Sequence, residues 1–294
     1  MKNRYDIHIH SSFSPDAQDS IPDIIKAAKK AGLKGIAITD HNTVSGLEKF
    51  VLAVKKADLE FLEGIEISSR YKDFDMHILG YSLNFNKQLL RKELKHTLGG
   101  YNLRAKKLLR KCQAADLISE KFKFENLLEK KKDSYVSTRD IMLEIEKFKR
   151  IPYTEAAKLV ARGTPLFEKM PSSGVLSPAQ ATNLLHRAGG ISVLAHPYYI
   201  TRQQKASGNP KKYLLEILKA GKFDGIEVYY SKHTMEEKKL FYQIAEQENL
   251  AVTGGSDWHG KKFTPNWPVG CQGINSKQFS ALKNLIKKGQ ALLS

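Results

Sequence analysis

Short apolar runs alternate with amphipathic segments toward both ends of this chain, and the alternation limits the folds that it can adopt. Residues 21–32 have a helical pattern with Ser20 as the N-cap, and the apolar run GIAIT follows at once. The segments SGLEKFVLAVKKAD and FLEGIEIS repeat this pattern, and it resumes from LSPAQATNLLHRAGG onward. Because strands that alternate with helices are typical of a parallel sheet or barrel, we predict an α/β fold.

The middle of the chain differs, because residues 86–168 have helical patterns and almost no strand signal. The predicted helices are KQLLRKELKHTL, NLRAKKLLRKCQAA, FENLLEKK, STRDIMLEIEKF and YTEAAKLVARG. Between Asn86 and Met170 the sequence has 21 Lys and Arg and 11 Asp and Glu, so this stretch carries +10 of the formal charge of +17. Such a field attracts anions, including nucleic-acid phosphates. We predict a discontinuous α/β domain, residues 1–84 and 174–294, with a basic helical insertion at 85–173.

Length and composition favour a globular protein, since 294 residues with 41% apolar residues can bury a large core. The chain contains no apolar stretch long enough to span a membrane, and MKNRYDIHIH runs into a strand without a signal-peptide core. Cys112 and Cys271 are the two cysteines, so no disulfide framework is expected. We expect a cytoplasmic protein with no membrane association and no obligate protein partner.

Residues that commonly bind metal ions recur in and directly after the predicted strands. YDIHIHSS places two histidines on one face of a strand, because alternate residues point to the same side. One histidine alone is more often a core or surface residue, but here several such motifs coincide. Imidazole and carboxylate together favour zinc, manganese or iron over calcium. The nine candidate ligands are His8, His10, Asp16, His41, Glu66, His77, His196, Asp257 and His259.

Longer segments around these motifs extend the pattern: AGGISVLAHP, DGIEVYY followed by Lys232 and His233, and GGSDWHG. Together they resemble the PHP (polymerase and histidinol phosphatase) family, and within it the TrpH-like phosphoesterases, which also carry a helical insertion at this place. The resemblance implies a distorted (β/α)7 barrel that binds two or three divalent metal ions, Mn, Zn or Fe, at the carboxyl ends of its strands.

The resemblance also implies how the ligands divide among the ions. The first set is His8, His10, Glu66 and Asp257, the second is Glu66, His77 and His196, and the third is Asp16, His41 and His259. The family loop after the first strand usually reads HSxxSDG, whereas this chain reads HSSFSPDA with Pro15 before Asp16. Asp19 is therefore an alternative ligand in the third set.

The expected chemistry is attack of a metal-bound hydroxide on a phosphate ester. We expect His8, His10, Glu66 and Asp257 to be catalytic as metal ligands, and His233 to protonate the leaving oxygen or bind a phosphate, with solvent exposure as its alternative. Substrate phosphates would also contact Lys232. By resemblance, Arg104 and Arg139 occupy places where TrpH-like insertions carry phosphate-binding arginines, although Asp140 and Ile141 stand where that subfamily has Pro-His.

These observations predict a metal-dependent phosphoesterase that acts on phosphorylated nucleotides or short oligonucleotides. It would be a nucleoside 3',5'-bisphosphate phosphatase, a 5'-3' exonuclease, or both. The alternatives are a histidinol-phosphate-type phosphatase, a nucleic-acid-binding module with a non-catalytic metal site, and a basic protein that only binds polyanions. Four tyrosines near strand ends could stack a base, although packing is favoured for each: Tyr198, Tyr199, Tyr229 and Tyr230.

Overall fold

A computed structural model of the chain describes residues 5–131, 134–169, 174–203 and 209–292. The chain divides into two compact units, unit 1 with residues 1–93 and 176–294, and unit 2 with residues 94–175. The predicted insertion at 85–173 begins earlier than unit 2, and residue 173 itself lies outside the described residues.

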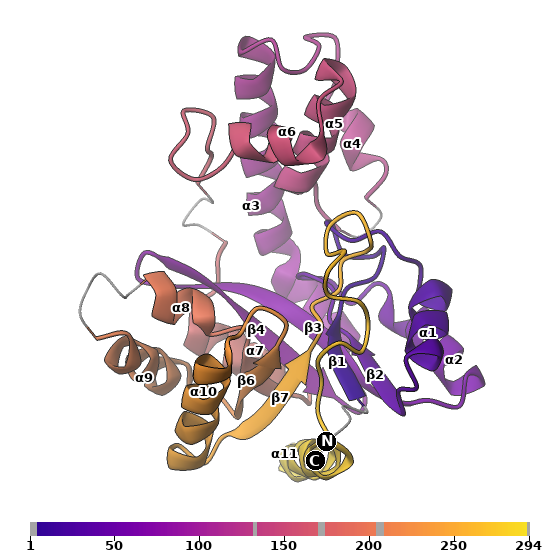
Figure 1. Ribbon diagram of the computed structural model, residues 1–294, viewed down its shortest axis with the longest axis vertical. Coiled ribbons are helices and arrows are strands. Elements are labelled where there is room, and N and C mark those ends of the chain that lie inside the picture. Colours follow the sequence, from indigo (N-terminus) through magenta and orange to yellow (C-terminus); the bar gives the residue numbers. More distant parts are fainter. Residues whose placement is uncertain (1–4, 132–133, 170–173, 204–208, 293–294) are drawn as a thin grey trace. The chain divides into compact units, whose positions relative to one another are not determined.

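Unit 1 is built on a seven-stranded sheet whose strands follow the order of the chain (Figure 1). Neighbouring strands are parallel, except that the fourth runs antiparallel to both of its neighbours. The strands are β1 (Tyr5–Ile9), β2 (Gly35–Ile38), β3 (Glu60–Tyr71), β4 (Phe74–Ser82), β5 (Ile191–Leu194), β6 (Gly225–Tyr230) and β7 (Ala251–Gly255).

The first and last strands meet where they end. The N–H of Asp257 donates to the carbonyl of His8 at 2.8 Å, and the N–H of His10 donates to the carbonyl of Trp258 at 2.9 Å. The sheet therefore closes almost into a barrel. The predicted distorted (β/α)7 barrel is confirmed, and the antiparallel β4 is a clear departure from a regular one.

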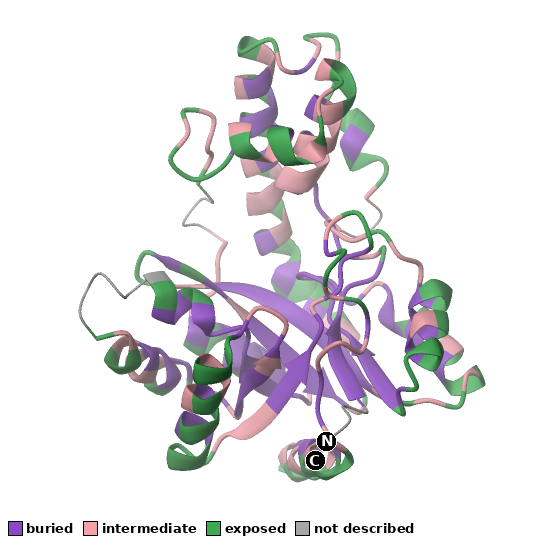
Figure 2. Ribbon diagram, viewed as in Figure 1, coloured by how far each residue is buried: buried purple, intermediate pink, exposed green. Residues whose placement is uncertain are grey.

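Helices cover the outside of this sheet, and its strands are largely buried (Figure 2). Two helices flank the β1 and β2 side, α1 (Ile21–Lys30) and α2 (Leu47–Lys56) (Figure 1). Three helices flank the other side: α8 (Tyr198–Gln203), α9 (Pro210–Gly221) and α10 (Met235–Gln247). Helix α7 (Pro178–Arg187) packs on β3, β4 and β5. Ser20 caps α1 as predicted, since its hydroxyl accepts from the N–H of Asp23 at 3.3 Å. Among the described helices, none is long and apolar enough to cross a membrane.

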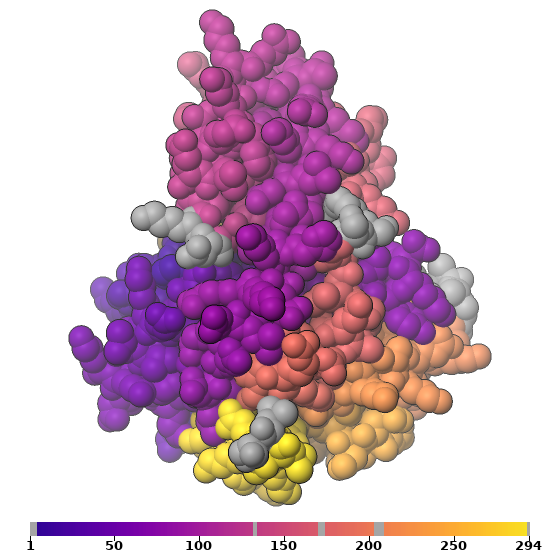
Figure 3. Space-filling view, turned by 180° about the vertical axis from the view of Figure 1, so that it is seen from behind, coloured from indigo at the N-terminus to yellow at the C-terminus, as the bar shows by residue number. Residues whose placement is uncertain are grey.

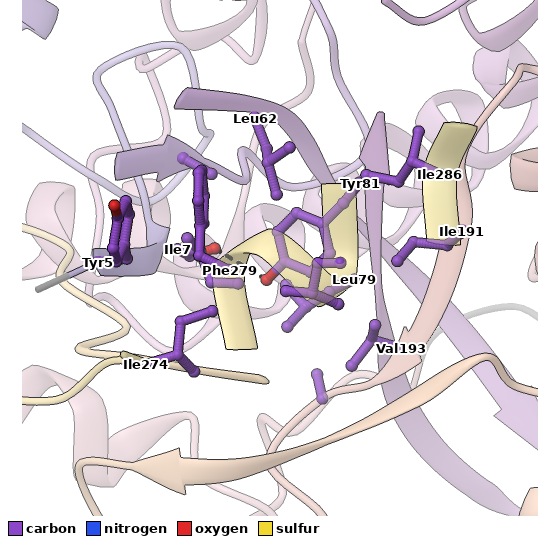
Figure 4. Packing of buried hydrophobic residues seen from close by; sticks show 13 residues of the cluster. Tyr5, Ile7, Leu62, Leu79, Tyr81, Ile191, Val193, Ile274, Phe279 and Ile286 are labelled. Atoms are coloured by element: carbon purple, nitrogen blue, oxygen red, sulfur yellow. Dashed lines mark hydrogen bonds between the residues drawn. The ribbon is translucent and has the colours of Figure 1, made fainter. Parts of the chain in front are cut away.

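Helix α11 (Ser276–Ala291) completes the core of unit 1 and was not among the predicted elements. The ring of Phe279 stacks on that of Tyr5 with centroids 4.1 Å apart. Ile286 belongs to the same cluster as Tyr81 and Ile191 (Figure 4). The opposite side of α11 lies at the surface (Figure 3). The helix thus joins the C-terminal part of the chain to the first strand.

Unit 2 is helical, with most of α3 (Lys87–Ala114) followed by α4 (Glu125–Leu128), α5 (Thr138–Lys149) and α6 (Tyr153–Leu159). The prediction of two separate helices at 87–98 and 102–115 was wrong, because α3 continues through Gly99 and Gly100. Each glycine costs about 1 kcal/mol relative to alanine in a helix. The side chains of Leu94, Ala105 and Leu108 are nevertheless buried on both sides of the glycines at helical spacing, and this packing outweighs the cost.

The packing of α11 predicts a large effect of Phe279→Ala on stability. The ring is 1% exposed, and its removal should lower the free energy of unfolding by about 3–5 kcal/mol in urea denaturation. Leu52→Ala, at a side chain that is 65% exposed on α2, is the matched control and should change it by less than about 0.5 kcal/mol. Equal effects of the two substitutions would contradict the role of α11 in the core.

Candidate metal centre

The nine candidate ligands lie in unit 1, at or beyond the ends of strands from across the sheet. His8 is in β1 and His10 follows it, while Asp257 and His259 follow β7. His77 is near the amino end of β4, but antiparallel pairing sets it opposite Ser68, close to the carboxyl end of β3. The reversed direction of β4 therefore brings His77 to the same end of the sheet as the others.

Glu66 of β3 lies at the centre of the cluster and is fully buried. Its two carboxylate oxygens face ring nitrogens of five histidines that come from four different parts of the sheet. Around Oε2 lie His8, His10 and His41 at 3.4, 3.1 and 3.3 Å, and around Oε1 lie His77 and His196 at 3.0 Å each. One carboxylate thus links nearly all of the motifs found in the sequence.

Asp257 forms a second carboxylate centre. Its Oδ1 lies 3.3 Å from His8 Nε2, 3.2 Å from His10 Nε2 and 3.5 Å from His259 Nδ1. Its Oδ2 accepts a hydrogen bond from the hydroxyl of Tyr230 at 2.9 Å. Asp257 therefore shares two histidines with Glu66.

Asp16 faces the remaining side of the cluster, with Oδ2 3.6 Å from Nε2 of both His41 and His259. Its Oδ1 accepts from the hydroxyl of Ser14 at 2.8 Å. Asp19, the alternative ligand, instead accepts from the indole N–H of Trp258 at 2.8 Å. The geometry therefore favours Asp16 over Asp19 in the third ligand set.

The backbone is strained at two of these positions. His196 has φ +26° and Asp257 has φ +55°. Residues other than glycine rarely adopt such values, and those that do cluster at functional sites. The N–H of His196 donates to Glu227 Oε2 at 2.8 Å, which helps to hold its peptide in this conformation.

Three groups of these side chains bring one ligand atom from each member within 4.8 Å of the others. They are His8, His10, Glu66 and Asp257; His10, Asp16, His41 and His259; and His41, Glu66 and His77. The first group matches the first predicted set. The second group contains the third predicted set and adds His10. The third group differs from the second predicted set, because it contains His41 in place of His196.

The donor chemistry of this cluster fits divalent cations. Three buried nitrogens, His10 Nε2, His41 Nδ1 and His77 Nδ1, have no hydrogen-bond partner among the described residues, although carboxylate oxygens lie 3.0–3.3 Å away. Imidazole nitrogens and carboxylate oxygens that face one another without hydrogen bonds suit a shared cation, because each offers it a lone pair.

Proton affinities in the cluster are strongly coupled. Burial alone would raise the pKa of Glu66, but His41, His77 and His8 hold it well below its usual range. Burial alone would lower the pKa of His10, but Asp257 and Glu66 raise it to about 9. A cation that binds here would therefore displace a proton from His10 at neutral pH.

Sequence reasoning did not assign roles to two buried carboxylates beside the candidate ligands. Glu227 in β6 is fully buried, and its Oε1 lies 2.9 Å from His8 Nδ1. Asp40 accepts from both the N–H and the hydroxyl of Ser11 at 2.7 Å. A charge inside the apolar run GIEVYY was the signal that could have identified Glu227.

His233 and Lys232 follow β6 in unit 1. The ring of His233 is buried, and its Nδ1 donates to the carbonyl of Val228 at 2.8 Å, so solvent exposure is excluded for this residue. Burial lowers its pKa to about 3. The neutral ring therefore presents Nε2 as an acceptor. Lys232 Nζ lies 4.8 Å from the ring centroid of Trp267, a cation–π contact that fixes the position of its charge.

Arg104 and Arg139 lie in unit 2. Arg104 in α3 donates from Nε to the carbonyl of Glu168 at 2.7 Å, so part of its guanidinium is already bound. Arg139 lies in the first turn of α5, where Ser137 and Asp140 form a capping box. The phosphate-binding role of both arginines stays a prediction.

Comparison with known proteins adds independent information. A family model of the PHP domain matches residues 6–257. A Haemophilus influenzae 5'-3' exoribonuclease is 26% identical over 266 residues, 88% of this chain and 91% of that protein. An Eggerthella lenta phosphoribosyl 1,2-cyclic phosphate 1,2-diphosphodiesterase is 25% identical, with 87% and 94% covered. A Chromobacterium violaceum 3',5'-nucleoside bisphosphate phosphatase is 24% identical, with 86% of each chain covered.

The fold is also found among solved structures. A Bifidobacterium adolescentis protein, inferred to be a metal-dependent phosphoesterase, superposes with a TM-score of 0.80 and covers 95% of this chain and 94% of its own. Its identity is 23%, so this likeness supports the fold alone.

The contacts of Glu227 predict that Glu227→Gln weakens metal binding. The amide offers one acceptor oxygen for the two donors, His8 Nδ1 and the N–H of His196, and no longer stabilises His8 electrostatically. Changes of this kind cost about 10- to 100-fold in metal affinity. Titration calorimetry with Mn²⁺ or Zn²⁺ measures the effect, and Glu236→Gln, at an exposed residue of α10, is the control. An unchanged affinity in Glu227→Gln would contradict this role.

Proposed function

Because this chain belongs to the PHP domain family, we propose that it is a metal-dependent phosphoesterase that hydrolyses phosphate esters of nucleotides. The resemblance identified in the sequence motifs is confirmed by the family match. The proposed substrates are nucleoside 3',5'-bisphosphates and short 5'-phosphorylated oligonucleotides, and the proposed location is the cytoplasm. The relatives described above include both a bisphosphate phosphatase and an exoribonuclease.

One observation carries this proposal: the buried carboxylate of Glu66 is shared by five histidines and lies beside a second carboxylate, Asp257. We infer that the nine residues predicted as ligands hold two or three divalent ions, with Mn, Zn or Fe as candidates. When bound, such ions activate water near neutral pH and neutralise charge on the phosphoryl oxygens.

The surrounding residues then orient this centre and bind substrate. Glu227 fixes the ring of His8 through Nδ1, and the Tyr230 hydroxyl fixes the carboxylate of Asp257. Lys232 supplies a positive charge for a substrate phosphate. His233 Nε2 is a buried acceptor without a hydrogen-bond partner among the described residues, and protonating a leaving oxygen would require the doubly protonated ring.

The test is a comparison of substrates with the metal-loaded enzyme. We expect Mn²⁺- or Zn²⁺-dependent release of phosphate from nucleoside 3',5'-bisphosphates, or of mononucleotides from 5'-phosphorylated oligonucleotides. His10→Ala removes a nitrogen shared by two ligand groups and should lower kcat/KM by more than about 100-fold, while circular dichroism stays unchanged. A preference for histidinol phosphate, or nucleic-acid binding without turnover, would contradict the proposal.

The surface of α3 favours an oligonucleotide among these substrates. Between Glu93 and Asp116 the sequence has six Lys and Arg and no acidic residue. Four of the six are exposed and have no ion pair in the described part of the chain: Lys95, Lys106, Lys107 and Arg110. Solvated helices usually alternate charges, as α5 does with Glu144, Glu146 and Lys147. A purely cationic face instead suits a chain of phosphates.

Neutralising this face should weaken binding of oligonucleotides but not of mononucleotides. For Lys106→Gln, Lys107→Gln and Arg110→Gln combined, the slope of log affinity against log salt should become shallower by up to about 2, since each single-strand phosphate contact contributes about 0.7. Fluorescence anisotropy with a phosphorothioate oligonucleotide measures the slope. The control removes equal charge at the exposed residues Lys121, Lys123 and Lys147. The same slope in both triple variants would refute a role of this face.

A further inference from the structure

Four tyrosines near the strand ends were candidates for stacking a base, and the structure separates them. Tyr198 and Tyr230 are buried, at 5% and 1% exposure, and Tyr229 is partly buried. Tyr199 is 40% exposed. Of the four, Tyr199 alone therefore presents an accessible ring.

Tyr199 lies beside the metal centre, because it follows His196 by three residues at the start of α8. Its ring meets the ring of His196 edge-on, with centroids 5.2 Å apart. The Nε2 atom of the same histidine lies 3.0 Å from Glu66 Oε1. A single imidazole thus separates the exposed ring from the central carboxylate.

The ring of Tyr199 is supported from behind by other aromatic groups. Its centroid lies 4.1 Å from that of Tyr198, which in turn stacks on Tyr230 at 5.4 Å with planes 22° apart. Arg202 packs over the Tyr198 ring at 4.5 Å and is held by two hydrogen bonds of 2.8 Å to Glu237. Tyr199 is therefore the outer ring of a braced stack, and little conformational freedom remains for a ligand to remove.

Exposure of an aromatic ring does not by itself indicate a ligand, as Tyr242 of α10 illustrates. Tyr242 is also 40% exposed, but among the described residues it has no ring contact with the cluster. Tyr199 combines exposure, a fixed orientation and contact with a candidate metal ligand. A planar apolar group attached to a phosphate bound at the cluster would find this ring within reach.

We propose that Tyr199 is the platform on which the base of a nucleotide substrate stacks while its phosphate is bound at the metal centre. This inference rests on the proposed function and narrows it. Every base has a face that can stack on an aromatic ring, so the platform selects nucleotides without reading their sequence. It also favours nucleotides over phosphoribosyl esters that lack a base, the class on which the Eggerthella lenta relative acts.

The experiment compares Tyr199→Ala, Tyr199→Phe and the control Tyr242→Ala in the metal-loaded enzyme. The substrates are adenosine 3',5'-bisphosphate and methyl riboside 3',5'-bisphosphate, which carries the same phosphates without a base. In Tyr199→Ala we expect kcat/KM for the adenosine compound to fall roughly 5- to 100-fold, mainly through KM. The kcat/KM for the riboside compound should be unchanged in this variant. Tyr199→Phe keeps the ring and should behave like the wild type, as should Tyr242→Ala.

Equal losses of kcat/KM for both substrates in Tyr199→Ala would contradict the proposed platform, because the ring would then act only by supporting His196. The metal content of the variant measures that support separately. A wild type that hydrolyses the riboside as well as the nucleotide would also overturn it. If the wild type hydrolyses neither ester and also releases no mononucleotides from 5'-phosphorylated oligonucleotides, the proposed function fails. In that case calorimetric titration of adenosine 3',5'-bisphosphate still tests whether Tyr199 is a platform. Weaker binding in Tyr199→Ala, but not in Tyr199→Phe or Tyr242→Ala, supports the platform, and equal binding in all variants rejects it.

Discussion

The carboxylate of Glu66 is the group on which the metal centre depends. An ionised carboxylate that is fully buried carries a large desolvation penalty unless opposite charges or hydrogen-bond donors surround it. Here the surroundings are five imidazoles, and they reach Glu66 because the sheet runs in chain order from β1 to β5. A change in strand order or in the direction of β4 would leave Glu66 without part of this shell. The topology of unit 1 and the chemistry of the cluster therefore constrain each other.

The sequence identifies the candidate ligands that the fold brings together more readily than it identifies the residues that orient them. His8, His196 and Asp257 stand in short motifs at strand ends, which are visible without knowledge of tertiary structure. Glu227 looks like part of an apolar strand, and only the fold shows that its carboxylate receives two donors from other strands.

Local sequence rules compete with packing, and this competition explains where the predicted fold was wrong or incomplete. The glycines at 99 and 100 indicated a helix end, but the buried positions of α3 continue across them. The direction of β4 depends on a tight connection through Lys72, which adopts φ +53° without a typical hairpin sequence such as Asn-Gly. Helix α11 went unpredicted although its contacts with Tyr5 and Tyr81 complete the core.

Closure of the barrel has a consequence for how this protein is made. The hydrogen bonds from Asp257 to His8 and from His10 to Trp258 join residues that are far apart in the sequence, so the contact order of unit 1 is high. During synthesis, β1 leaves the ribosome long before β7, and half of the carboxylate pair at the centre is missing until the last strand is available. A nascent chain therefore cannot assemble the complete cluster of candidate ligands before Asp257 has been synthesised.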